Sequence, residues 1–136
     1  MRRAIALAAA IAVVAGCGNP GGDLIAIEEH GGPAGAQRLV VTDDGRGSCN
    51  GGELKRLPSE RLLEAREAER NLQGLPGKDR LDFGRLPGRT IYTARMRGAE
   101  VTWSEGARQP PVLPKTTLLA LKLRNELCPA IAGAAP

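Results

Sequence analysis

Few side chains in this 136-residue chain are of a type that does chemistry. His30 is the only histidine, so a histidine-based metal site or a Ser-His-Asp relay would depend on it, with Glu28 and Glu29 as neighbouring carboxylates. A histidine at a strand end more commonly meets solvent. The loop carboxylates lack the spaced ladder of a calcium site, the serines lack a nucleophile elbow, and no glycine motif continues into a phosphate-binding helix start. The sequence therefore predicts a protein that is not an enzyme, with no metal and no cofactor.

Residues 1–16 have the composition of an export signal. A basic start, Met1-Arg2-Arg3, precedes twelve apolar residues, Ala4 to Ala15. Such a run suits a signal-peptide core and is short of the roughly 20 residues of a permanent membrane helix. A buried N-terminal helix is the alternative, but the glycines from Gly16 onward and Pro20 would stop it.

The segment Val14-Ala15-Gly16-Cys17 resembles the lipobox of bacterial lipoproteins. The resemblance implies that the Cys17 thiol receives a diacylglyceryl group and that cleavage makes Cys17 the first mature residue. A thiolate has the nucleophilicity for that transfer, and several acyl chains hold a membrane more firmly than one. We expect a lipid anchor on the outer face of the cytoplasmic membrane and a flexible tether over residues 17–22. A plain secreted protein with an ordinary signal is the alternative.

Two cysteines, Cys49 and Cys128, are left once Cys17 carries lipid. An even remainder in an oxidising compartment indicates a disulfide, which would close a loop of 80 residues. Free thiols are the alternative, and nothing near either cysteine in the sequence would activate one. We therefore expect a bridge from an early strand to the end of the last helix.

Charge and aromatic content exclude nucleic acid as a partner. The mature chain would have 17 basic and 15 acidic side chains, and the only aromatic residues are Phe83, Tyr92 and Trp103. Nucleic-acid binding needs a basic patch or aromatic platforms. The arginines at 85, 89, 95 and 97 cluster in sequence, but those at 89, 95 and 97 share a strand parity and should line a solvated face.

The apolar spacing predicts one α+β domain over residues 23–129, followed by a frayed tail over residues 130–136. We expect a small antiparallel sheet of about four to five strands with two helices on one face, in the order β-β-β-α-β-β-α. Ser59 is the expected N-cap of the first helix, Leu118 is expected in the apolar stripe of the second, and Leu86 is expected over the core. The expected strands cover 23–29, 37–42, 47–49, 89–97 and 100–105, and the helices cover 59–73 and 112–127.

The segment Gly31-Gly32-Pro33-Ala34-Gly35 is a run of small or rigid uncharged residues between two strands. Such a segment lets another backbone approach closely. We interpret it as a partner-binding loop, with an ordinary wide hairpin loop as the alternative.

The order of these features resembles emfourin-type proteins, small bacterial inhibitors of thermolysin-like metallopeptidases. The resemblance rests on the 31–35 loop after the first strand, Leu75-Pro76, Tyr92, Val101 to Trp103, and Pro111 before the Leu118 to Leu127 helix. It implies the same fold and a peptidase as partner. The chain departs from that pattern at Pro33, in the double turn over residues 43–52 and in the two cysteines. The combined features also suit uncharacterised actinobacterial lipoproteins, which share the preference for Arg over Lys.

Two functions fit these expectations. The first is a membrane-anchored, non-catalytic protein-binding module resembling a protease inhibitor. The second is a structural lipoprotein, or a carrier of a lipid or small apolar ligand in the cell envelope. A carrier would need a sizeable apolar cavity between sheet and helices.

Overall fold

The computed structural model describes residues 22–32, 35–77, 79–106 and 108–129. The predicted signal peptide, Cys17 and the tail over residues 130–136 lie outside these ranges, as do Pro33 and Ala34. The elements are β1 (Asp23–His30), β2 (Gln37–Thr42), β3 (Arg46–Cys49), β4 (Lys55–Arg56), α1 (Ser59–Gln73), β5 (Arg80–Asp82), β6 (Ile91–Met96), β7 (Ala99–Ser104) and α2 (Val112–Leu127).

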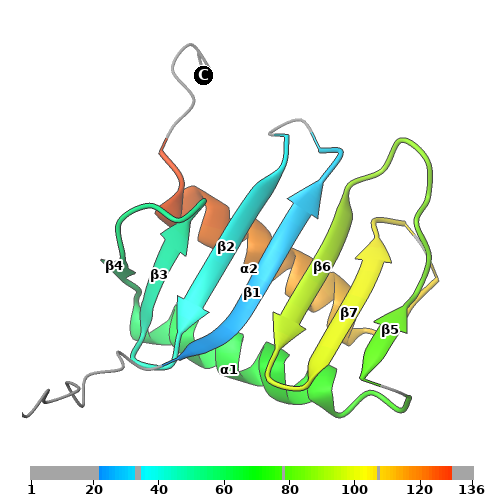
Figure 1. The fold of residues 1–136 in the computed structure, drawn as a ribbon, viewed down its shortest axis with the longest axis horizontal. Helices are drawn as coiled ribbons and strands as arrows, with labels where there is room; N and C mark the ends of the chain where they lie inside the picture. The colour runs from blue at the N-terminus through cyan, green and yellow to red at the C-terminus, as the bar shows by residue number, and fades with distance from the viewer. Residues whose placement is uncertain (1–21, 33–34, 78, 107, 130–136) are drawn as a thin grey trace, which may run out of the picture.

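The strands form one seven-stranded sheet in the order β4-β3-β2-β1-β6-β7-β5 (Figure 1). The prediction of four to five strands in an antiparallel sheet was wrong on both points, because β4 and β5 extend the two edges and β5 pairs parallel with β7. These strands have two and three residues, too few to show an alternating pattern. The α+β class is as predicted.

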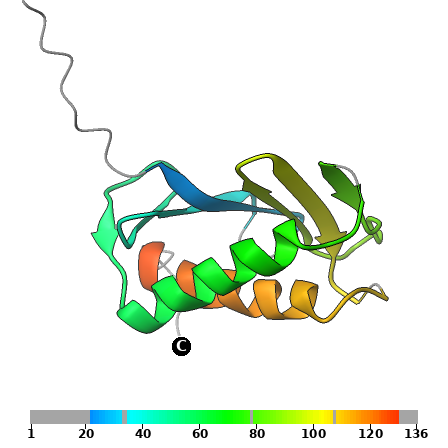
Figure 2. The same cartoon turned by 90° about the horizontal axis from the view of Figure 1, so that it is seen from below.

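Both helices cover the same face of the sheet, and Figure 2 shows the two layers edge-on. Alternate strand residues point toward the helices, so Ile25, Ile27 and Leu39 are fully buried. Trp103 and Tyr92 stack with ring centroids 5.5 Å apart and are 0% and 1% exposed. The space between sheet and helices is therefore filled by side chains.

The helix boundaries agree with the apolar periodicity, but three residue assignments were wrong. Pro58, rather than Ser59, occupies the N-cap of α1, and no side chain caps that end. Leu118 is 52% exposed, because the buried stripe of α2 follows Leu119, Leu123 and Leu127 instead. Leu86 is 41% exposed, in the connector between β5 and β6.

The disulfide between Cys49 and Cys128 is present, with the two α-carbons 5.2 Å apart. It joins the last residue of β3 to the C-cap of α2. Beside it, Gly47 gives α2 room, since a Cβ at that position would lie 2.7 Å from Leu127 Cδ1. The end of α2 is thus held against the β3 edge of the sheet.

The sheet face away from the helices has a ladder of alternating charges. The ladder crosses five strands that are neighbours in the sheet but do not follow one another in sequence order: β5, β7, β6, β1 and β2. In that order, these strands contribute Arg80, Glu100, Arg95, Glu28 and Arg38. Consecutive members are ion paired, at 3.6 Å for Arg80–Glu100, 3.0 Å for Arg95–Glu100 and 3.7 Å for Arg38–Glu28. Arg95 also pairs with Glu28. Of the clustered arginines, Arg95 therefore lies on a solvated strand face as expected.

In the part of the chain that the structure describes, neither helix has the length and apolar content to cross a bilayer.

Candidate functional site

The 31–35 segment begins where β1 ends, next to the start of β6. His30 pairs with Ile91 in the sheet, so the residues just before β6 lie beside the glycines just after β1. Gly31 has a φ of +75°, which turns the chain out of the strand at little cost for a residue without a Cβ. The Gly35 amide donates to the Gly32 carbonyl at 3.0 Å, which holds the two described ends of the segment close together.

Gly31 and Gly32 lie against the two residues that come directly before β6. A Cβ at Gly32 would lie 3.0 Å from the Thr90 hydroxyl oxygen, and one at Gly31 would lie 3.5 Å from the Arg89 carbonyl oxygen. The far side is open, since a Cβ at Gly35 would meet nothing within 4 Å. Gly31 and Gly35 are exposed. Gly31 and Gly35 therefore present backbone to solvent at the two ends of the segment.

A buried carboxylate lies under this corner of the sheet. Glu29, the neighbour of His30, is 1% exposed and points to the helix side, where Arg124 of α2 donates to its Oε2 at 3.2 Å. Its Oε1 is buried and has no hydrogen-bond partner among the described residues. Burial raises the pKa of Glu29 above its usual range, and the attraction of Arg124 only partly offsets this.

Tyr92 and Trp103 lie next to Glu29 across the paired strands. Tyr92 pairs with Glu29 across β1 and β6 and with Trp103 across β6 and β7. Burial and the nearby Glu105 and Glu29 raise the pKa of Tyr92 to about 12, so its hydroxyl stays protonated near neutral pH. The Trp103 indole N–H donates to the Thr117 hydroxyl of α2 at 2.9 Å.

His30 lies at the end of β1 beside a single carboxylate. Its side chain is 52% exposed and lies 3.6 Å from Glu28, a carboxylate that the charge ladder already occupies. No group of three metal-ligating side chains occurs in the ranges that the structure covers.

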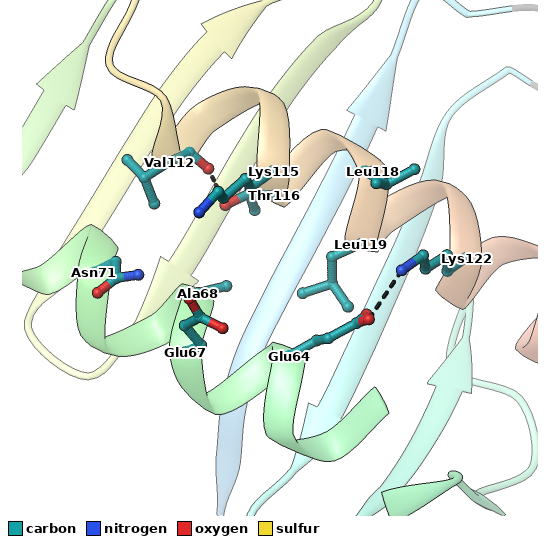
Figure 3. A pocket seen from close by; sticks show the side chains of 10 residues that line it. All are labelled: Glu64, Glu67, Ala68, Asn71, Val112, Lys115, Thr116, Leu118, Leu119 and Lys122. Atoms are coloured by element: carbon teal, nitrogen blue, oxygen red, sulfur yellow. Dashed lines mark hydrogen bonds and ion pairs between the residues drawn. The ribbon is translucent and has the colours of Figure 1, made fainter. Parts of the chain in front are cut away.

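Two features of the described structure were not found from the sequence. One is the Glu29–Arg124 pair, although Glu29 shares the strand parity of Ile25 and Ile27 and so could have been placed on the buried face. The other is a groove between α1 and α2 (Figure 3), which depends on how the two helices pack and has no signal in the sequence.

Comparison with known proteins gives no assignment, because no protein-family model, no curated protein and no solved structure matches this chain.

Proposed function

We propose that this protein is a lipid-anchored, extracytoplasmic binding module that uses the 31–35 segment to contact a protein partner. The observation that carries the proposal is that Gly31 and Gly35, at the two ends of this uncharged segment, are exposed, while Gly31 and Gly32 lie against the residues before β6 in the central strand pair β1–β6. The two ends of the segment are held by β1 and by the hydrogen bond from Gly35 to Gly32, and a segment with fixed ends loses less entropy when it binds. Partners whose clefts accept extended backbone, as peptidases do, suit such a segment.

The position of the segment also fits an anchored protein. The predicted tether enters the domain at Asp23, and β1 then runs for eight residues before the segment begins. At about 3.3 Å per residue, the strand separates the two by roughly 26 Å. An anchor at Cys17 would therefore leave the binding segment at the far end of β1 from the membrane.

The emfourin-like order of elements supports a thermolysin-like peptidase as the partner class. The strand, helix and connector order on which the resemblance rests is the order of the elements β1, β2, α1, β6, β7 and α2. Within this proposal, the segment occupies the peptidase cleft without being cleaved, because both its ends are held by hydrogen-bonded strands.

The carrier alternative has less support from the described residues. Trp103 and Tyr92 fill the layer between sheet and helices. A hollow of about 410 Å³ lies at the edge near β5, but Gln73, Asp79 and Arg97 contribute polar groups to its lining. An apolar ligand would be poorly matched to those groups. We therefore keep the protein-binding proposal alone.

Anchoring is tested with the full chain expressed in a bacterial host that processes lipoproteins. We expect the mature protein to start at Cys17, to gain the mass of its acyl chains and to sediment with membranes. The Cys17→Ser variant should lose the lipid and leave the membrane fraction. An intact Met1 end with no added mass would contradict the anchor without bearing on the binding segment.

Binding is tested by inhibition of a thermolysin-like protease with the full chain in mild detergent. We expect inhibition at micromolar concentrations, and an unchanged rate there would remove the peptidase proposal. The Gly35→Leu variant should weaken inhibition by about tenfold or more, because its side chain enters the contact.

Gly98 offers a matched control for the Gly35 substitution. Both glycines have nearly the same φ, +72° and +73°, and neither has an atom within 4 Å of an added Cβ. The two leucine variants therefore carry similar backbone strain. Gly98 belongs to the β6–β7 turn at the opposite end of the sheet (Figure 1), so Gly98→Leu should leave inhibition unchanged. Equal losses in both variants would mean that strain, rather than contact, explains the effect.

A further inference from the structure

The outer side of the helix layer contains a groove of about 230 Å³ between α1 and α2 (Figure 3). Ala68, Leu119 and Thr116 form its floor, and all three are buried. The Thr116 hydroxyl donates to the Val112 carbonyl within its own helix at 2.8 Å, so it needs no partner in the groove. Leu118 lines the groove and is 52% exposed.

The two walls of the groove have opposite charge. Glu64 and Glu67 line it from α1, and Lys115 and Lys122 line it from α2. Glu64 and Lys122 are paired with each other at 2.9 Å, across one part of the groove. Glu67 and Lys115 are exposed and take part in no ion pair among the described residues. Figure 3 shows them opposite each other on the two walls.

We infer that this groove is a self-complementary surface that takes a second copy of the chain. A two-fold axis along the groove would place α2 of each copy over α1 of the other. Lys115 would then lie above the partner subunit's Glu67, and the same pair would form again on the other side of the axis. An isologous interface requires such a reciprocal match: if residue i of one copy contacts residue j of the other, the same contact forms a second time with the copies exchanged. The contact also covers Leu118 in both copies.

The association is measured by sedimentation velocity of the full chain in a non-ionic detergent, from about 1 μM to about 1 mM. We expect a monomer–dimer equilibrium within that range. Lys115→Glu and Glu67→Lys should each weaken it about tenfold or more, because each places two like-charged pairs in the homodimer. A chain that stays monomeric over the whole range would overturn the inference.

Mixing the two variants provides the sharpest test of the geometry. In a dimer of Lys115→Glu with Glu67→Lys, both cross-pairs again join opposite charges. The mixture should therefore regain the affinity of the unchanged chain while each variant alone stays weak. A mixture that associates no better than its components would overturn the proposed pairing and would assign any dimer to another surface, such as residues 1–16 or the open sheet face.

An apolar substitution with a matched control separates the groove from general hydrophobic association. Leu118→Ser should weaken the dimer, whereas Leu54→Ser should not, since Leu54 is similarly exposed at 41% and lies outside the groove. Equal weakening by both would contradict a specific contact. All the substituted side chains are exposed, and unchanged thermal melting of each variant would establish that the fold is intact.

Discussion

Glu29 is the described residue whose environment conflicts most with its charge. It is buried, one carboxylate oxygen lacks a partner among the described residues, and Arg124 only partly compensates. Its raised pKa means that folding favours the protonated form. The stability that Glu29 contributes is therefore fully present below about pH 4.5, its ordinary pKa, and is lost as the pH rises through its folded value.

We expect Glu29→Gln to remove this pH dependence, because the amide keeps the shape of the side chain without its charge. The variant should match the original chain near pH 4 and exceed its unfolding free energy near pH 7. Urea midpoints at the two pH values measure this. Glu53→Gln, in the exposed stretch between β3 and β4, controls for the loss of one negative charge. A Glu29→Gln variant that is less stable at pH 7 would show that the ion pair with Arg124 outweighs the cost of burial.

Gly47 is required by close packing. An added Cβ would lie 2.7 Å from Leu127 Cδ1 and 3.2 Å from the Val40 carbonyl oxygen, and that backbone oxygen cannot move aside as a side chain can. We expect Gly47→Ala to lower the unfolding free energy by about 1–3 kcal/mol, the usual cost of overpacking. Gly74→Ala is the control in the same denaturation experiment, since its nearest contact would be an ordinary 3.5 Å and its φ is negative. Equal effects from both would rule out the packing explanation.

At the scale of elements, the disulfide decides how firmly α2 stays on the sheet. Cys49 and Cys128 are 79 positions apart, so the bridge restricts most of the domain in its unfolded state. On the chain-entropy account, the double variant Cys49→Ser/Cys128→Ser should lose roughly 4.5 kcal/mol of unfolding free energy. Guanidinium unfolding of the variant and of the reduced original chain should give similar stabilities. A loss under about 1 kcal/mol would contradict this role for the bridge.

The long elements were predictable and the short edge strands were not. The leucine and alanine spacing placed α1 and α2, and the alternation of Ile25 and Ile27 placed β1. By contrast, β4 is only Lys55–Arg56, and it exists because β3 offers it a free edge. In the same way, the parallel pairing of Arg80–Asp82 with β7 depends on where the connector after α1 returns to the sheet. Neither strand has a local pattern of its own.

At the scale of the whole molecule, the charge ladder ties five strands together across the open face. Glu28 is ion paired with both Arg95 and Arg38, and the His30 imidazole lies 3.6 Å from it. The Glu28 side chain is 20% exposed and its partners are about half exposed, so solvent screens these pairs.

We therefore expect Glu28→Gln to cost only about 0.5–1 kcal/mol of unfolding free energy at low salt. The difference from the original chain should shrink in 1 M NaCl, where the screening length falls to about 3 Å. Urea unfolding at the two salt concentrations measures both effects, with Glu53→Gln again as the control. A difference that is unaffected by salt would mean that Glu28 acts through packing or hydrogen bonding rather than through charge.

The sequence by itself determined the α+β class, the helix boundaries and the disulfide partners, because each of these depends on local periodicity or on a count of cysteines. It also predicts export and lipidation from residues 1–17, which lie outside the described ranges. Only the tertiary structure decided the strand order, the charge ladder, the buried Glu29–Arg124 pair and the groove between the helices. Each of these includes contacts between residues far apart in the chain, such as Arg95 with Glu28, so each depends on which strands and helices become neighbours, and no local pattern encodes that choice.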